Sequence, residues 1–331
     1  MKKPINWGIM GCGRIASLFS NGLRTLKNSR IHAVASLTPE KADRFAKAHQ
    51  IPEAYTKYES LAEDPDIDIV YVATLHNAHY NNTLMALHSG KHVLCEKPFT
   101  LNAAQAKELI KTARTKKLFL MEAMWTRFLP ASQKIKQLID QGVIGEIKTL
   151  RAEFGFYTPW NPNDRLHNLN LAGGALLDIG IYPISYAHWI FGEKPLKING
   201  SAYIGSTHVD EHSSCLLTFT KGRSALLFSS FNIKVPNEAL IAGTKGYIRI
   251  PNFFKPTKFW AHDQKGKLHT FRIPYKSTGL QYQAKAAADC IFKGEIESSI
   301  MPLNETLEIM ETLDTLRSQW RFVYPEEKIN F

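Results

Sequence analysis

Long apolar runs are missing from this chain of 331 residues. A helix that crosses a membrane needs about 20 consecutive apolar residues, and no stretch of the sequence approaches that length. A secretory signal is not expected either, because the apolar segment after Lys2 and Lys3 is interrupted by Gly8, Gly11 and Arg14. The sequence therefore predicts a cytoplasmic protein without a membrane partner.

Cysteine is also scarce. The chain holds Cys12, Cys95, Cys215 and Cys290. These residues form no Cys-x-x-Cys pair, and none has a histidine at metal-ligand spacing. We therefore expect buried free thiols in a reducing compartment, and neither disulfides nor a metal centre.

Acidic residues are outnumbered, with 30 Asp and Glu against 41 Lys and Arg, which gives a formal net charge of +11. The basic residues are spread along the chain, and the longest cluster is the pair Lys116-Lys117 with its neighbours. A nucleic-acid surface needs basic residues gathered on one face, so no nucleic-acid partner is expected. An anionic small molecule or simple solubility accounts for the excess. Hydrophobic residues make up 44% and charged residues 21%, values typical of a folded globular chain.

The first part of the chain alternates short apolar runs with amphipathic segments, as far as about residue 124. Such alternation predicts a parallel sheet covered by helices on both faces. The expected strands are 5–10, 31–37, 67–74, 92–95 and 118–121, and the expected helices are 14–26, 39–49, 83–88 and 102–115. We assign residues 1–124 to a Rossmann-like, dinucleotide-binding domain of an α/β protein.

Residues 125–331 follow a different pattern, typical of an α+β domain. Several short strands separated by turns predict a large, mainly antiparallel open sheet. An aperiodic stretch rich in Pro and Asn, residues 158–170, precedes the most apolar helix of the chain. The expected elements are a strand at 146–157, a helix at 174–191, at least five strands within 196–273, and helices at 281–293 and 303–321. We expect this domain to bind the substrate.

A glycine-rich loop follows the first expected strand and opens the first helix, with the sequence Gly8-Ile9-Met10-Gly11-Cys12-Gly13-Arg14-Ile15. A strand, a glycine loop and a helix in this order form the dinucleotide-binding fingerprint. Gly11 and Gly13 let the backbone approach a pyrophosphate, and the amides at the start of the helix face its negative charge. The residues expected to bind the cofactor here are Gly8, Gly11, Gly13, Arg14 and Ile15.

The end of the second strand contacts the adenosine ribose in this fold. Ser36, Leu37 and Thr38 stand there, and Lys41 follows one helical turn later. No carboxylate is present to repel a 2′-phosphate, and Ser36, Thr38 and Lys41 can bind one. The sequence therefore favours NADP as cofactor and leaves NAD possible.

Two further motifs carry reactive side chains. Lys97 lies in Glu96-Lys97-Pro98, directly after a strand, at the edge where open parallel sheets bind ligands. Asp178 and Tyr182 are four residues apart on the buried apolar helix and so share a face. A buried carboxylate costs several kcal/mol unless it is paired, and Lys97 is a candidate partner. A core ion pair beside a structural tyrosine is the alternative.

Together these motifs resemble the Gfo/Idh/MocA oxidoreductase family, over essentially the whole chain. Residues 93–98, 119–128 and 173–182 are similar to the branch of the family that contains dihydrodiol dehydrogenases and NADP-dependent D-xylose dehydrogenases. The resemblance implies hydride transfer between nicotinamide and a hydroxyl or carbonyl of a sugar, polyol or cyclic diol. It also implies a homodimer formed through the open sheet of the C-terminal domain.

The resemblance assigns roles to individual residues as well. It makes Lys97 the catalytic lysine, Asp178 its support and Tyr182 the acid/base. Leu37 stands where the branch carries an arginine for the 2′-phosphate. Further cofactor contacts are expected from Thr74, His76, His79, Glu96, Lys97, Trp125 and Arg127. Substrate contacts are expected from Lys97, Trp125, Phe154, Tyr157 and Tyr182. For the aromatic residues core packing is an alternative role, and for His79 a structural one.

In the expected mechanism Tyr182 takes the proton of the substrate hydroxyl during oxidation and returns it during reduction. A neighbouring Lys97 ammonium would favour the phenolate, and Asp178 would balance the charge of that lysine. Two other functions stay open, a sensor that binds dinucleotide without turnover and another chemistry of the family such as inositol oxidation. The presence of all three side chains favours an enzyme.

Overall fold

The computed structural model describes residues 3–330, with side chains as far as residue 327. The chain forms two compact units. The first contains the residues up to Trp125 together with Lys276–Leu307, and the second contains Thr126–Tyr275 together with the residues from Glu308 onward. The sequence pattern assigned 125–331 to one domain, whereas the structure groups the segment Lys276–Leu307 with the dinucleotide-binding half.

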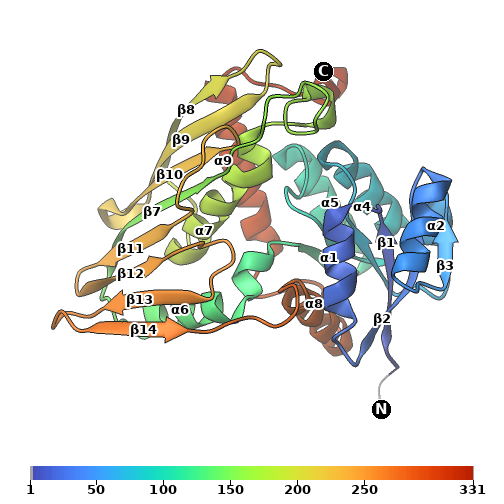
Figure 1. The fold of residues 1–331 in the computed structure, drawn as a ribbon, viewed down its shortest axis with the longest axis horizontal. Helices are drawn as coiled ribbons and strands as arrows, with labels where there is room; N and C mark the ends of the chain where they lie inside the picture. Colours follow the sequence, from blue (N-terminus) through green and yellow to red (C-terminus); the bar gives the residue numbers. More distant parts are fainter. Residues whose placement is uncertain (1–2, 331) are drawn as a thin grey trace. The chain divides into compact units, whose positions relative to one another are not determined.

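Within the described residues, the first unit holds a six-stranded sheet in the order β3-β2-β1-β4-β5-β6, with every pair parallel (Figure 1). The strands are β1 (Ile5–Met10), β2 (Ser29–Ala35), β3 (Glu53–Tyr55), β4 (Ile69–Val72), β5 (His92–Cys95) and β6 (Leu120–Glu122). All residues of β1 and β4 are buried, as expected for strands covered on both faces. Strand β1 lies between β2 and β4, so the order of the strands reverses beside β1. In doubly wound folds, ligands bind at such a switch point.

Helices connect the parallel strands of the first unit. They are α1 (Arg14–Leu23), α2 (Pro39–Ala48), α3 (Tyr58–Glu63), α4 (His79–His88) and α5 (Ala103–Lys116). The same unit contains α8 (Gln281–Lys293). Helix α8 comes from the far end of the sequence and lies against α1 (Figure 1). A Cβ on Gly22 of α1 would lie 3.1 Å from the backbone nitrogen of Gln281. The small residue therefore permits a close helix crossing, and this crossing explains why the segment belongs to the first unit.

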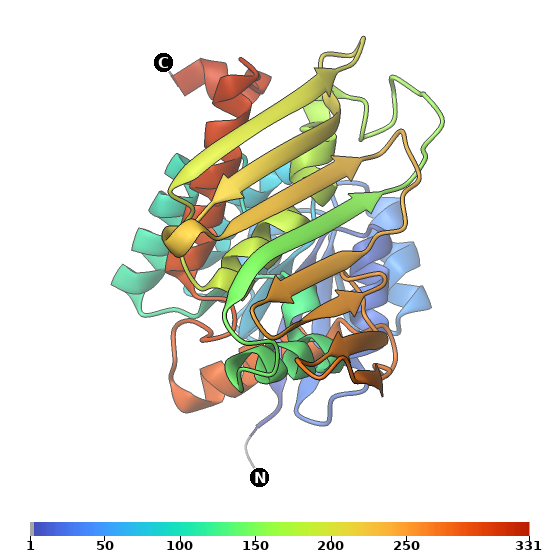
Figure 2. The ribbon, with the colours of Figure 1, turned by 90° about the vertical axis from the view of Figure 1, so that its left-hand side faces the viewer.

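Within the described residues, the second unit holds an eight-stranded sheet in the order β14-β13-β12-β11-β7-β10-β9-β8. Its pairs are antiparallel except for β7 with β10. The strands are β7 (Ile147–Gly155), β8 (Lys197–Ile204), β9 (Asp210–Thr218), β10 (Ser224–Ser230), β11 (Ala239–Gly243), β12 (Gly246–Ile250), β13 (Lys258–His262) and β14 (Leu268–Arg272). Figure 2 looks onto this sheet, with β7 in green between β10 and β11. The expected fold class, a Rossmann-like parallel sheet followed by a mainly antiparallel one, is confirmed.

The helices of the second unit include α6 (Pro130–Asp140), which the sequence pattern did not reveal, and α7 (Ile181–Phe191). A last long helix, α9 (Leu303–Gln319), begins in the first unit and ends in the second. Helix α7 packs against β7 and β10. No helix among residues 3–330 is long and apolar enough to cross a membrane.

The segment expected as one helix at 174–191 is divided in the structure. A π-helical turn, η4 (Leu176–Gly180), precedes α7. Pro183 has no N–H to donate, and it lies in the first turn of α7. The backbone stays right-handed helical from the wide turn into α7, with the Ile181 N–H donating to the carbonyl oxygen of Leu176, and Asp178 falls in the wide turn. Wide turns of this kind are frequent at functional sites.

Candidate functional site

The glycine loop after β1 forms a cradle of backbone. Gly11 has φ +103°, and a Cβ there would lie 2.5 Å from the carbonyl oxygen of Ala73. A Cβ on Gly13 would meet no heavy atom of the described residues within 4 Å, so this residue borders open space. In the described part of the chain no side chain caps the first turn of α1. Its free N–H groups can therefore bind a pyrophosphate.

The end of β2 presents small hydroxyl groups and one exposed apolar side chain. Ser36 is buried, and its Oγ accepts the Thr38 N–H at 3.2 Å. Leu37 is 68% exposed, and Lys41 is also exposed. Burial raises the pKa of the nearby Cys12 thiol to about 11, so this cysteine stays protonated. The position that would meet a 2′-phosphate is therefore open to solvent.

His79 connects the turns that follow β4 and β5. Its Nδ1 lies 2.7 Å from the carbonyl oxygen of Pro98, and its Nε2 lies 3.2 Å from that of Thr74. The ring is buried, and this burial lowers the pKa of His79 to about 4. The neutral ring donates to one of these two carbonyl oxygens, and the shorter contact is to Pro98, which follows Lys97 in a cis peptide bond. The structure gives His79 a positioning role, and direct contact with the cofactor stays a prediction.

Glu96 is also engaged in fixing the backbone near Lys97. Its Oε1 accepts the hydroxyl of Tyr71 at 2.5 Å, and its Oε2 accepts the Lys97 N–H at 3.2 Å. The ring of Tyr71 stacks on Phe19, with 3.7 Å between centroids. Tyr71 is a site residue that the sequence pattern missed, and a tyrosine in a fully buried strand was the available signal.

In the second unit Asp178 forms a two-bond ion pair with Arg165. The guanidinium Nη1 lies 3.1 Å from Oδ1, and Nη2 lies 3.3 Å from Oδ2. The side chain of Asp178 is 7% exposed and that of Arg165 is 45% exposed. Burial lowers the pKa of the Arg165 guanidinium, but the neighbouring charges raise it by more, so the net shift is upward. Asp178 contributes most to this rise, and Tyr182 contributes less. Arg165, from the aperiodic stretch 158–170, is thus a cation on this carboxylate that the sequence reading did not assign to it. The pairing of Asp178 with Lys97 stays a prediction.

Tyr182 lies in a cluster of aromatic rings. Its ring meets Phe154 edge-on at 5.3 Å and Phe254 at 6.1 Å, and these two phenylalanines stack at 4.1 Å. Phe154, expected at the substrate, is thus packed against Tyr182, and Phe254 was missed by the sequence reading. Tyr157 and Trp160 are 66% and 61% exposed. They do not fill the core, and contact of Tyr157 with substrate stays a prediction.

Arg127, expected at the cofactor, is buried within the second unit. Its Nη2 donates to the carbonyl oxygen of Ser185 at 2.7 Å and to the hydroxyl at 2.8 Å. Its guanidinium also lies 5.9 Å from the ring centroid of Trp189. Both partners are on α7, so Arg127 holds the helix that carries Tyr182. A contact of Arg127, Trp125, Thr74 or His76 with the cofactor stays a prediction.

One group of possible metal ligands occurs among the described residues, formed by His32, Asp64 and Asp66, with ligand atoms within 4.8 Å of one another. The carboxylate of Asp64 already accepts the Tyr55 hydroxyl at 3.1 Å and the Asp66 N–H at 2.9 Å. His32 Nε2 lies 3.2 Å from the same carboxylate. These contacts explain the cluster without an ion, and we assign no metal to it.

The buried His79 predicts a loss of stability in acid. Because its pKa is about 4 in the folded chain and about 6.5 in an unfolded one, the unfolded state binds the proton more readily. Its stabilising contribution is complete above pH 6.5 and declines as the pH falls to 4. The free energy of unfolding of the natural chain, relative to His79→Gln, should fall by about 3 kcal/mol between pH 7 and pH 4. Urea unfolding at each pH measures this difference, and a constant value would contradict it.

Comparison with known proteins agrees with both units. The family described as oxidoreductase family, NAD-binding Rossmann fold matches residues 5–124, and the GFO/IDH/MocA C-terminal domain matches residues 132–249. Relatives named trans-1,2-dihydrobenzene-1,2-diol dehydrogenase include that of Xenopus laevis, 41% identical over 96% of this chain and 99% of the relative. The Homo sapiens enzyme is 36% identical over 98% of this chain and 99% of its own.

Solved structures show the same fold. An aldose-aldose oxidoreductase from Caulobacter crescentus, complexed with glycerol, has a TM-score of 0.87 at 25% identity and covers 97% of this chain and 100% of its own. A 3-ketoreductase from Actinomadura kijaniata, in complex with NADP and TDP-benzene, has a TM-score of 0.83 at 28% identity and covers 96% of this chain and 98% of its own. Since both family domains are matched in order and the relatives align over nearly the full length, the chain belongs to the Gfo/Idh/MocA family of NAD(P)-dependent oxidoreductases.

Proposed function

We propose that this oxidoreductase uses NADP to interconvert a hydroxyl and a carbonyl on a cyclic diol or sugar, with Tyr182 as acid/base. The observation that carries the proposal is the ion pair that Arg165 forms with Asp178, which lies four residues before Tyr182 in the helical segment. A buried carboxylate held by a half-exposed arginine, one turn before a tyrosine, provides a charged environment for proton transfer. The alternatives, a non-catalytic sensor and inositol oxidation, become outcomes of the tests below.

The residues of the first unit fit a dinucleotide. Gly11 leaves room where a Cβ would collide with Ala73, and Gly13 opens onto the uncapped start of α1. Backbone amides of α1 would hold the pyrophosphate. Ser36, Thr38 and Lys41 would hold the 2′-phosphate. When bound, nicotinamide accepts a hydride from a carbinol carbon or returns one to a carbonyl carbon.

Tyr182 would handle the proton of the same reaction. During oxidation the hydroxyl O–H bond breaks as the hydride leaves the carbon, and the phenol oxygen of Tyr182 receives that proton. The Arg165 guanidinium interacts electrostatically with Tyr182, and a nearby cation favours the phenolate. Asp178 balances this positive charge. In the proposal Lys97 contributes a further cation from the first unit, at the end of β5, held by the backbone contacts of Glu96 and His79.

A ring-shaped substrate with neighbouring hydroxyls suits the exposed groups. The relatives are named for a cyclic diol, and the similar structures for an aldose and for a keto group. Tyr157 and Trp160 offer exposed aromatic faces in the second unit, and such faces pack on the apolar side of sugar and diol rings. We assign the substrate class on this basis. The four free thiols support a reducing, cytoplasmic location.

We also propose a homodimer formed through the eight-stranded sheet of the second unit. One face of this sheet carries exposed apolar side chains. They are Tyr203, Leu216, Leu226 and Tyr247. A shallow hollow on the same sheet spans the neighbouring strands β11, β7, β10, β9 and β8. Its lining includes Leu216, Leu226 and Phe228. Apolar patches of this kind on a sheet are typical of subunit interfaces.

Replacing Tyr182 by Phe removes the proposed acid/base and little else. Turnover should fall by about 10²–10⁴-fold, the share of a positioned proton-transfer group, with NADP affinity unchanged. Tyr186→Phe is the matched control, because Tyr186 lies one turn further along α7 and its hydroxyl has no hydrogen-bond partner among the described residues. Initial rates on a panel of pentoses, hexoses and cyclic diols, with both cofactors, measure the effect. Full activity of Tyr182→Phe would refute the assignment, and tight NADP binding without any turnover would favour a sensor.

A basic side chain at position 37 should strengthen the binding of the 2′-phosphate of NADP. Leu37→Arg is expected to lower the dissociation constant of NADP by about tenfold, the gain of one charge-assisted hydrogen bond, and to leave that of NAD unchanged. Leu196→Arg provides the control, since Leu196 is 67% exposed and Leu37 is 68% exposed. Fluorescence titration of each variant with NADP and with NAD measures the dissociation constants. Equal gains for both would show that the phosphate binds elsewhere.

A charge in the apolar hollow should separate the subunits. Leu226→Glu places a carboxylate at the centre of the proposed interface, where its desolvation is costly. Light scattering after gel filtration should give the mass of two chains for the natural protein and of one chain for the variant. Leu196→Glu, outside the hollow, should keep the dimer. A natural chain that elutes as a monomer would remove this part of the proposal.

A further inference from the structure

The segment that joins Arg165 to Asp178 folds back on a pair of glycines. The Gly173 N–H donates to the carbonyl of Asn168 at 3.0 Å, and the Gly174 N–H donates to that of Leu166 at 2.9 Å. A Cβ on Gly173 would lie 2.5 Å from the oxygen of Leu166 and 2.7 Å from that of Arg165. The loop that carries Arg165 can therefore pack against residue 173 only because that residue is a glycine, which has no Cβ. We call Gly173-Gly174 the glycine hinge.

Asp210, the first residue of β9, supports the glycine hinge from the sheet. Its side chain is fully buried, and its Oδ2 accepts the Leu176 N–H at 2.6 Å. A Cβ on Gly174 would lie 2.2 Å from its Oδ1. Asp210 lies on a strand, yet it caps the turn η4, which contains Asp178. In most helices the N-cap residue of the helix itself accepts this hydrogen bond. The mechanism described above makes no use of Asp210.

Tyr324, near the end of the chain, contacts the same hinge. Its hydroxyl donates to the carbonyl oxygen of Gly173 at 2.7 Å, and the residue is fully buried. Its N–H donates to Oε2 of Glu327 at 2.9 Å. The Arg317 guanidinium lies 5.2 Å from the centroid of its ring. The tyrosine is therefore held through its backbone N–H and its ring, and its hydroxyl contacts the hinge.

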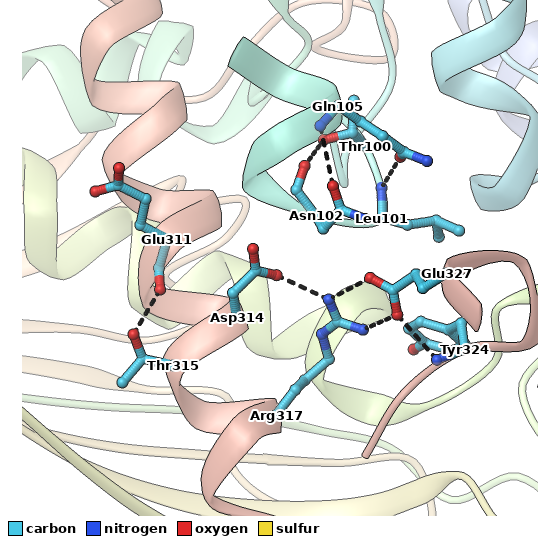
Figure 3. Close-up of polar contacts among 10 residues, drawn as sticks. All are labelled: Thr100, Leu101, Asn102, Gln105, Glu311, Asp314, Thr315, Arg317, Tyr324 and Glu327. Carbon is cyan, nitrogen blue, oxygen red and sulfur yellow. Dashed lines mark hydrogen bonds and ion pairs between the residues drawn. The ribbon is translucent and has the colours of Figure 1, made fainter. Parts of the chain in front are cut away.

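Arg317 itself is fixed by two carboxylates (Figure 3). Its Nη1 lies 2.6 Å from Oε2 of Glu327, and its Nη2 lies 2.9 Å from Oε1 of Glu327 and 2.7 Å from Oδ1 of Asp314. The side chains of Arg317 and Glu327 are 5% and 9% exposed. This cluster anchors the C-terminal segment to α9. The same segment, as η6 (Pro325–Asn330), contacts the turn η3 (Leu169–Leu171) of the Arg165 loop.

We propose that Asp210 and Tyr324 are positioning residues of the active site, which hold the glycine hinge so that Arg165 and Asp178 meet in their two-bond arrangement. The inference rests on the proposed function, because it treats that ion pair as part of the catalytic environment. Neither residue contacts the reacting atoms. Both act on backbone groups of the short segment between the two charged partners, and movement of that segment would alter the distance between them.

Tyr324→Phe tests the inference with the loss of one oxygen atom. In the protein with NADP bound, amide hydrogen exchange across residues 165–178 should become about five- to tenfold faster, the ratio expected for the loss of one buried hydrogen bond. The catalytic constant should fall with it, while the KM for NADP stays unchanged. Tyr186→Phe is the matched control, because Tyr186 is a buried tyrosine of α7 whose hydroxyl has no hydrogen-bond partner among the described residues. Exchange in β1 and β2 should stay constant in both variants, which shows that the fold is intact.

A second pair of variants examines Asp210. Asp210→Asn keeps an oxygen that can accept the Leu176 N–H, whereas Asp210→Ala removes it. The alanine variant should show fast exchange and low turnover, and the asparagine variant should recover most of both values. Equal loss in the two variants would assign the effect to the negative charge, and the capping role would be wrong.

The outcomes separate this inference from the proposed function. Unchanged exchange in Tyr324→Phe overturns the positioning role, whatever the activity. Faster exchange with natural turnover overturns it too, because the segment is then merely structural. If the natural chain itself turns over no hydroxyl substrate, the proposed function fails, and the exchange rates alone still decide whether Tyr324 and Asp210 hold the hinge.

Discussion

The Asp178 carboxylate sets the main constraint on the second unit. It lies in an apolar segment, with Leu176, Leu177 and Ile179 as neighbours, and an unpaired buried carboxylate costs several kcal/mol. Arg165 satisfies it with both guanidinium nitrogens. Because Arg165 comes from a stretch without regular secondary structure, the same ion pair also determines where that stretch lies. The ion pair that the proposed chemistry uses is thus also the contact that orders the loop.

In the first unit, buried side chains fix the backbone beside Lys97, the lysine of the proposed mechanism. Lys97 follows β5 directly, and the groups that fix the backbone around it are buried. Glu96 is bonded to Tyr71, and His79 reaches the carbonyl of Pro98. Backbone contacts of this kind define where a flexible side chain begins. In both units, then, the proposed chemistry would depend on residues that the substrate need not touch.

The sequence predicted the parts of this arrangement that are local. Buried strands such as β1 and the glycine loop after it are recognisable because their pattern is contained within a few residues. The strand β3 was missed because Glu53–Tyr55 is short and largely exposed, so it has no apolar pattern. Arg165 was missed as the partner of Asp178, since nothing in the spacing of two residues thirteen apart shows that a glycine hinge folds one onto the other. Asp210 and Tyr324 were missed for the same reason at longer range.

The division of labour between the units has a consequence for how specificity can change. Groups that would bind the dinucleotide, from Gly11 to Lys41, belong to the first unit, whereas Arg165, Asp178 and Tyr182 belong to the second. In the proposal, a substitution at the end of β2 alters contacts to the cofactor, whereas the ion pair between Arg165 and Asp178 is formed within the second unit. The second unit is more tightly constrained. Its loop and its helix are held by the same glycines, so a change of substrate is easier at exposed Tyr157 or Trp160 than at any residue that contacts the hinge.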